Sequence, residues 1–201
     1  MKDIHQIRML VFASLLAALM AVGAYLAVPL GPVPIVMQNM FVFLAGLLLG
    51  SRWALASVGV YLLTGAVGLP VFAGGLGGIG RIVGPTGGYL IGYLPAVFIV
   101  GVISGRGAAR FGRDVLAMIF ATVVLYACGV SWLKVLTGMT WSKTLALGMY
   151  PFLIGDALKI VAAALIAKAL RPVIRLTPGA QPKTEDRGQK TEVRRQRSEV
   201  E

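Results

Sequence analysis

The sequence of 201 residues is poor in the side chains that carry out chemistry, with one cysteine, one histidine and eight acidic residues. Cys128 has no partner for a disulfide or a cysteine-based metal site, and its apolar neighbours predict a packed or lipid-facing residue. His5 lies near the start of the chain, and no cluster of acids accompanies it. A GxxxxGK[ST] motif is absent, so ATP hydrolysis would require another subunit. We therefore expect no enzyme, no metal ion and no cofactor.

Charge is scarce as well. Charged residues make up 13% of the chain and hydrophobic residues 57%, whereas a soluble domain has about 25% charged and about 45–50% apolar residues. This composition indicates a membrane protein surrounded by a lipid bilayer. The net charge of +11 does not gather on one face with interleaved aromatic residues, because the basic residues stand singly beside apolar runs. We therefore expect no nucleic acid as a partner.

Six apolar runs predict an all-α, polytopic membrane protein with six transmembrane helices. The first run could also be a signal peptide, but it has about 20 apolar residues and no clear cleavage site, which favours a retained helix. A polar tail follows the last run, and we expect residues 177–201 to form a disordered tail beside a membrane domain of residues 1–176. The runs are 9–29, 35–50, 53–69, 86–104, 115–133 and 145–169.

The basic residues predict the orientation of the chain in the membrane. Three of them fall in connections on one side, namely Arg81, Lys134 and Lys143. The connections on the other side hold nine, and the positive-inside rule places these in the cytoplasm together with both termini and the tail. The nine are Lys2, Arg8, Arg52, Arg106, Arg110, Arg113, Lys168, Arg171 and Arg175.

The segment 70–85 contains six glycines and two prolines and cannot be one regular helix. Its GxGxxG pattern at 75–80 lacks the strand before it and the acid about 20 residues later that a dinucleotide site needs. Irregular backbone at membrane depth must be buried in protein or line a wet cavity. We expect this segment, with Phe72 and Gly75, to be a lid or wall of a ligand site, and a passive connector is the alternative.

Small residues recur every fourth position in two helices, and such faces let helix backbones approach closely. Packing within the chain is sufficient to explain Gly84, Gly88 and Gly92. The second set comprises Ala13, Ala17 and Ala21. For these alanines, the sequence leaves internal packing and docking of a partner subunit open.

The most informative pair is Asp156 and Lys159, because Asp156 is the only acid within the six apolar runs. Their spacing of three places both on one helix face, and charges inside a membrane usually mark a substrate or ion path. A self-neutralising structural ion pair is the alternative. Opposite charges also fit a small bifunctional ligand. Asp156 lies about eleven residues into its run, so a kink at Pro151 is needed to bring it to the outer level.

Few polar residues are available to join this pair in an outward-facing pocket. We expect Gln38, Arg81 and Thr86 to converge on it, with Phe72, Tyr89 and Trp132 as apolar walls.

Five motifs in order resemble the BioY family, the biotin-binding S components of energy-coupling factor (ECF) vitamin transporters. The resemblance covers about residues 13–170. The motifs are PVPI at 32–35 followed by Gln38, FLAGLLLG at 43–50, GLPVFAGG at 68–75, GPTGGYLIG at 84–92 and PFLIGDALK at 151–159.

The resemblance implies an S-component fold in a bacterial or archaeal cell membrane that captures biotin from outside. It implies partners as well, namely a transmembrane coupling protein, which would dock on Ala13, Ala17 and Ala21, and two cytoplasmic ATPases. Within the site it implies that Asp156 binds the ureido N–H groups and Lys159 the valerate carboxylate, under a covering loop at 72–78. Some relatives have an asparagine in that loop, a contact that Arg81 or Gln38 would replace here. A different small vitamin in the same fold is the alternative.

Overall fold

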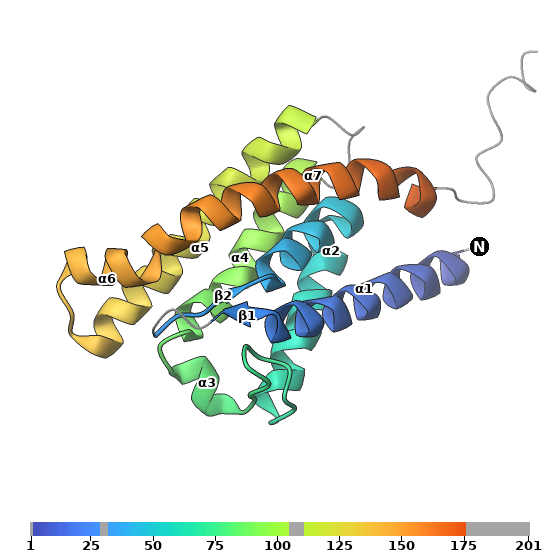
Figure 1. Ribbon diagram of the computed structural model, residues 1–201. Coiled ribbons are helices and arrows are strands. Elements are labelled where there is room, and N and C mark those ends of the chain that lie inside the picture. Colours follow the sequence, from blue (N-terminus) through green and yellow to red (C-terminus); the bar gives the residue numbers. More distant parts are fainter. Residues whose placement is uncertain (1, 29–31, 105–110, 176–201) are drawn as a thin grey trace, which may run out of the picture. The chain divides into compact units, whose positions relative to one another are not determined.

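The computed structural model describes residues 2–28, 32–104 and 111–175. It comprises two units, Met1–Arg171 and Pro172–Glu201, and the first contains everything discussed below. The predicted tail at 177–201 lies outside the described residues, as do Arg106 and Arg110. In chain order the elements are α1 (Lys2–Tyr25), β1 (Ala27–Val28), β2 (Ile35–Val36), α2 (Gln38–Ala66), α3 (Ile79–Val83), α4 (Gly87–Ser104), α5 (Phe111–Thr137), α6 (Trp141–Gly148), the 3₁₀ turn η1 (Tyr150–Phe152) and α7 (Leu153–Arg175) (Figure 1).

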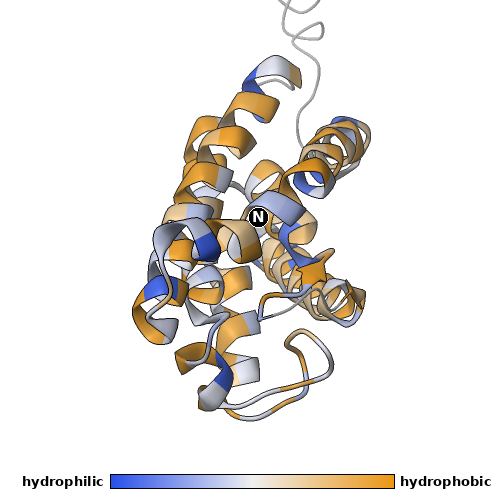
Figure 2. Cartoon of the chain, turned by 60° about the vertical axis from the view of Figure 1, so that its left-hand side comes forward, coloured by the Kyte–Doolittle hydropathy of each residue, from blue (hydrophilic) through white to orange (hydrophobic). Residues whose placement is uncertain are grey.

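Helices dominate the described residues, and the one small sheet is a two-stranded antiparallel pair in which Ala27 faces Val36. Within residues 2–28, 32–104 and 111–175, four helices are long and apolar enough to cross a membrane: α1 from Gln6 onward, α2, α4 and α5. Figure 2 shows these helices as largely hydrophobic along their length, with hydrophilic residues as isolated segments. The all-α prediction is therefore confirmed at the level of fold class.

The second and third apolar runs form one element, α2, with a sharp break inside it. Gly50 adopts φ 75° and ψ 174°, a conformation that residues with a side chain rarely adopt. The polar residues Ser51 and Arg52 predict an interruption here, but the break itself is at the glycine. The helix therefore changes direction at this point (Figure 1).

The sixth apolar run differs most from its prediction, because it is divided between three elements. Its first residues belong to the short helix α6, η1 follows, and the long helix α7 begins only at Leu153. Pro151 lies in η1 and has no N–H to continue a helix. Asp156 is therefore in the first turn of α7, not deep within a span, and the kink expected at Pro151 is present.

The glycine stripe of α4 serves packing within the chain. A Cβ atom added at Gly88 would lie 2.2 Å from Cβ of Trp132, and one added at Gly92 would lie 3.1 Å from Cβ of Cys128. The backbones of α4 and α5 can approach this closely only because these positions lack side chains.

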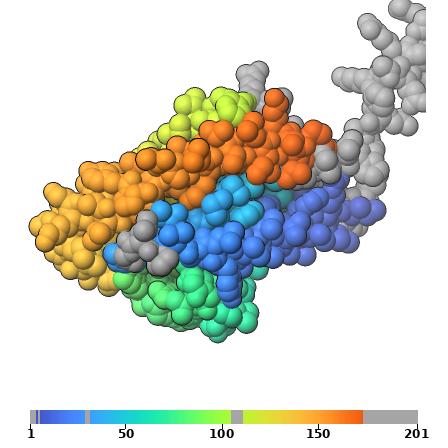
Figure 3. Space-filling view, viewed as in Figure 1, coloured from blue at the N-terminus to red at the C-terminus, as the bar shows by residue number. Residues whose placement is uncertain are grey.

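The alanine stripe of α1 also packs inside the chain. Ala13 and Ala17 are 7% and 8% exposed, and Ala21 is half-buried. The Ser57 hydroxyl on α2 donates to the carbonyl of Ala13 at 2.7 Å. In the space-filling view, α1 and α7 lie on either side of the first part of α2 (Figure 3). Internal packing therefore accounts for this stripe, and its role in docking remains a prediction.

Arg171 is a buried structural residue rather than a solvated cytoplasmic charge. Its Nη1 lies 2.6 Å from Oδ2 of Asp114, in the first turn of α5. Its Nη2 donates to the carbonyl of Ser104, the last residue of α4, at 3.4 Å, and its Nε donates to Leu47 at 3.3 Å. Leu47 lies three residues before the break in α2, where helix carbonyls lose their regular partners. One guanidinium thus joins α7 to α2, α4 and α5.

We expect Arg171→Met to lower the free energy of unfolding by about 3–5 kcal/mol, because it leaves the buried Asp114 carboxylate uncompensated. The measurement is denaturant unfolding of the purified chain in detergent, followed by circular dichroism. Arg52→Met, at an exposed position, is the control. The double variant Asp114→Asn/Arg171→Met should recover part of the loss, and a strictly additive double variant would contradict the pairing.

Candidate functional site

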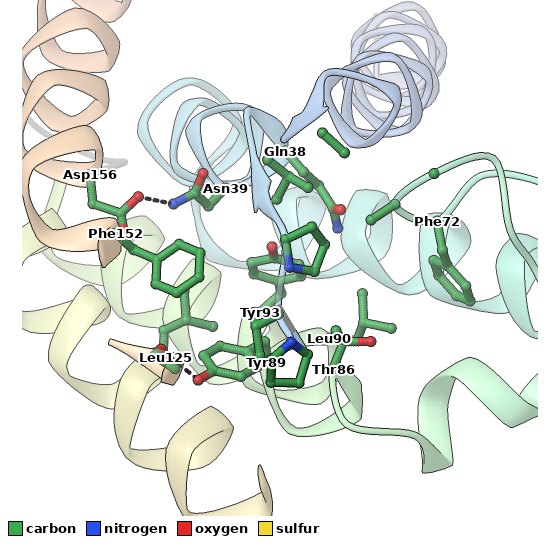
Figure 4. A pocket seen from close by; sticks show the side chains of 18 of the residues that line it. Gln38, Asn39, Phe72, Thr86, Tyr89, Leu90, Tyr93, Leu125, Phe152 and Asp156 are labelled. Atoms are coloured by element: carbon green, nitrogen blue, oxygen red, sulfur yellow. Dashed lines mark hydrogen bonds between the residues drawn. The ribbon is translucent and has the colours of Figure 1, made fainter. Parts of the chain in front are cut away.

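A cavity of about 400 Å³ lies among α2, α3, α4, α5, α7, the β1–β2 pair and the loop before α3 (Figure 4). Seven of the eight residues predicted for a ligand site line it, namely Gln38, Phe72, Arg81, Thr86, Tyr89, Asp156 and Lys159. Gly75 is not among the lining residues, and its neighbour Gly74 takes that place. These residues come from five separate segments, so only the tertiary structure brings them together.

The carboxylate of Asp156 is the centre of the polar network in this cavity. Its Oδ1 accepts from Asn39 Nδ2 at 2.8 Å and from Lys159 Nζ at 3.0 Å, and its Oδ2 accepts from the Tyr126 hydroxyl at 2.6 Å. The Lys159 ammonium also donates to the carbonyl of Val36 at 2.7 Å. Asp156 and Lys159 are 5% and 6% exposed. The network satisfies the pair and fixes it against α2, α5 and β2.

Some hydrogen-bonding capacity remains after these contacts. An ammonium has three donors and a carboxylate about four acceptor sites. Lys159 uses two donors here and Asp156 uses three acceptor sites. One donor and one acceptor site are therefore left within the described residues. The pair is structural and still has hydrogen-bonding capacity that a bound molecule could use.

Two amides at the start of α2 add to this capacity. Gln38 and Asn39 are 2% and 6% exposed, and within the described residues Gln38 Nε2 and Asn39 Oδ1 have no hydrogen-bond partner. The amide of Gln38 points into the cavity, while the amide of Asn39 is turned toward Asp156 (Figure 4). A buried polar group without a partner costs about 1–3 kcal/mol, so a ligand that supplies the partner gains affinity.

The glycine-rich loop forms one wall of the cavity, which favours the lid or wall interpretation over a passive connector. Phe72, Ala73, Gly74 and Arg81 all contribute to the lining. Gly74 and Gly75 have φ of 76° and 71°, and these left-handed residues close a turn in which the N–H of Gly75 donates to Phe72 at 3.0 Å.

Two aromatic contacts anchor this loop. The ring of Phe72 packs edge-on against Tyr61, with centroids 5.6 Å apart, and lies over Gly65. The Tyr25 hydroxyl, at the end of α1, donates to the carbonyl of Pro70 at 2.6 Å. Figure 4 shows the Phe72 ring directed away from the other labelled side chains, so Phe72 holds the wall in place more than it faces the cavity.

Sequence reasoning placed Trp132 wrongly and missed Asn39 and Tyr126. Trp132 does not line the cavity. Its Nε1 donates instead to the carbonyl of Gly84 at 2.9 Å, which ties the segment before α4 to α5. Asn39 was detectable as a second amide directly after Gln38. Tyr126 carries no local signal, since it lies in an apolar helix and meets Asp156 only through the packing of α5 against α7.

The described residues contain no group of three or more metal-ligating His, Cys, Asp and Glu side chains. The chemistry available in the cavity is therefore that of hydrogen bonds and ion pairs, offered by Asp156, Lys159, Gln38, Asn39 and Arg81. This set suits the recognition of a small polar molecule.

Comparisons with known proteins point in the same direction. The family described as "BioY family" matches residues 1–176. A probable biotin transporter BioY from Pyrococcus horikoshii is 42% identical over 158 residues, covering 79% of this chain and 93% of the relative. The biotin transporter BioY from Thermotoga maritima is 39% identical over 164 residues, covering 82% and 96%.

A solved structure agrees with these relatives. It is the crystal structure of the S-component for biotin from an ECF-type ABC transporter, with a TM-score of 0.79 and 28% sequence identity, covering 86% of this chain and 95% of that one. The family predicted from the five sequence motifs is thus confirmed. This chain belongs to the BioY family.

Proposed function

We propose that this chain is the substrate-capturing S component of a biotin transporter. The observation that carries the proposal is the cavity of about 400 Å³ in which the buried Asp156–Lys159 ion pair meets two amides that each have one buried atom without a hydrogen-bond partner. Its size falls within the range of about 300–1,000 Å³ typical of small-molecule sites. Relatives named as biotin transporters support biotin as the ligand. A different small vitamin in the same fold is the alternative.

The contact between Asp156 and Lys159 bears on how biotin would lie. Biotin carries its ureido ring and its carboxylate at opposite ends, whereas the two side chains lie 3.0 Å apart. We therefore revise the roles implied by the family resemblance and assign both residues to one end. Asp156 accepts from a ureido N–H group, and Lys159 and Gln38 donate to the ureido carbonyl. Arg81, half-exposed on α3, then takes the carboxylate in place of Lys159.

The wider setting is also part of the proposal. We propose six spans with both termini in the cytoplasm, α2 supplying two of them and α7 the last, in the cell membrane of a bacterium or archaeon. A transmembrane coupling protein and two ATPases would complete the transporter, and 177–201 would be a polar cytoplasmic tail beside the membrane domain of 1–176. Because Ala13 and Ala17 are buried, a partner docking on this stripe would first meet Ala21.

We expect micromolar biotin to bind the detergent-purified chain in a calorimetric titration. Asp156→Asn, Lys159→Met and Gln38→Leu should each weaken binding, because each removes a hydrogen bond to the ligand. Bonds that involve a charged group contribute about 1.5–3 kcal/mol, or roughly tenfold to a hundredfold in Kd. Thr144→Val is the control, since Thr144 is buried but does not line the cavity. Undetectable binding to the unsubstituted chain would overturn the biotin assignment.

The carboxylate assignment is tested with biotin and biotin amide, which differ only in the charge at the valerate end. We expect the unsubstituted chain to prefer biotin, and Arg81→Gln to abolish that preference while ureido recognition persists. Lys159→Met should weaken both ligands equally. If Lys159→Met removes the preference and Arg81→Gln does not, Lys159 binds the carboxylate and the revised roles are wrong.

We expect Tyr25→Phe to speed the release of bound biotin by roughly twofold to tenfold, because the loop over the cavity loses one hydrogen bond of about 0.5–1.5 kcal/mol. Stopped-flow displacement of a fluorescent biotin derivative measures the release rate. Tyr150→Phe, at an exposed residue outside the cavity lining, serves as the control. An unchanged release rate in Tyr25→Phe would show that this bond does not restrain the loop.

A further inference from the structure

A second hollow, of about 480 Å³, lies among α5, α6 and α7 and is lined almost entirely by apolar side chains. We call it the lateral groove. Its lining includes Ile119, Val123, Ala127, Leu145, Leu153 and Ala157. Ala127 and Ala157 are exposed, and their short side chains on the two long helices give the groove its depth.

Exposed apolar side chains surround the lateral groove. Val123 is 59% exposed and Leu153 is 45% exposed, and the neighbouring Ile154 and Leu158 on α7 are 80% and 69% exposed. The chain belongs to a family of membrane transporters, so exposed side chains of this kind face hydrocarbon. Side chains that line an empty hollow lose dispersion contacts. In a bilayer, a lipid acyl chain is available to restore them.

A basic residue lies beside the groove. Trp141 on α6 lines the groove, and Nζ of Lys134 lies 5.0 Å from the centre of its ring. Of the acids whose side chains the structure describes, Asp114 pairs with Arg171 and Asp156 with Lys159. Lys134 thus offers positive charge next to a tryptophan, the residue type that gathers at membrane interfaces.

We propose that the lateral groove binds one acyl chain of an anionic phospholipid, whose phosphate lies at Lys134. The two parts of the site match the two parts of such a molecule, an apolar channel for the chain and an ammonium group for the phosphate. Neutral lipids carry the same chain without the net charge, so Lys134 selects the anionic headgroup.

The position of the groove gives this lipid a consequence for the ligand cavity. Tyr126 and Asp156 line both the ligand cavity and the lateral groove. The hydrogen bond of 2.6 Å between these two side chains therefore lies between the cavity and the groove. An acyl chain packed against Tyr126 from the groove side holds the carboxylate of Asp156 in its place. On the proposed function, biotin should therefore bind more tightly in membranes that contain the anionic lipid.

The site can be tested without biotin in lipid nanodiscs that each contain one copy of the protein. Phosphatidylglycerol or phosphatidylcholine with brominated acyl chains is titrated over the same range of mole fractions, and quenching of tryptophan fluorescence is measured. We expect roughly fivefold less phosphatidylglycerol than phosphatidylcholine to give half-maximal quenching, because the Lys134 ammonium attracts the charged headgroup by about 1 kcal/mol. Trp141→Phe should remove this lipid-dependent part of the signal, which assigns it to the groove.

Two sets of variants separate the parts of the site. Lys134→Gln should abolish the preference for phosphatidylglycerol, and Ala127→Phe/Ala157→Phe should abolish the quenching by filling the groove. Ala18→Phe, at an exposed position on α1, is the matched control and should change neither. Circular dichroism establishes that each variant is folded.

Equal quenching by the two lipids would overturn the proposal, as would full quenching in the filled variant. Loss of quenching when two chains share one nanodisc would assign the groove to a second copy of this chain and overturn the lipid proposal as well. Since these measurements use no biotin, their failure is distinct from a failure of the proposed function. Biotin titration in the same nanodiscs then tests the link between the two hollows.

Discussion

The need to balance one buried carboxylate organises the part of the structure that forms the site. Asp156 lies in an apolar helix, where an unpaired charge would be costly. Its partners come from α7 itself, from α2 and from α5, and Lys159 extends the network to β2. Because each partner is on a different element, satisfying this charge also sets the distances between the walls of the cavity.

A second buried ion pair performs the same task at the other end of α7. Arg171 follows Asp156 by fifteen residues, or about 22 Å of helix, and it joins Asp114 and the ends of two other helix segments. The α7 helix is the least apolar of the long helices, and three of its charged side chains, Asp156, Lys159 and Arg171, are buried and paired. Charges that lower its hydropathy therefore help to hold it in the bundle.

Much of the fold was predictable because hydrophobicity and glycine content are local signals. The long apolar runs predicted α1, α4 and α5 closely, and the glycines predicted an irregular loop that contributes to the cavity wall. Two details have local causes that sequence patterns do not resolve. Gly50 can be helical or left-handed, and a proline such as Pro151 can kink a helix or separate two. Packing decided both: α2 breaks at Gly50, next to the predicted interruption, and the last helix begins at Leu153.

The scarcity of charge by itself determined that this chain is a helical membrane protein and that Asp156 and Lys159 are exceptional. It also pointed to most of the charged and amide side chains that line the cavity, since polar side chains in apolar surroundings are few. Only the tertiary structure decided which of them meet. It placed Asn39 and Tyr126 on the carboxylate, turned Trp132 toward Gly84 and buried Arg171, because hydrogen bonds between distant segments depend on how helices pack and leave no periodic trace in the sequence.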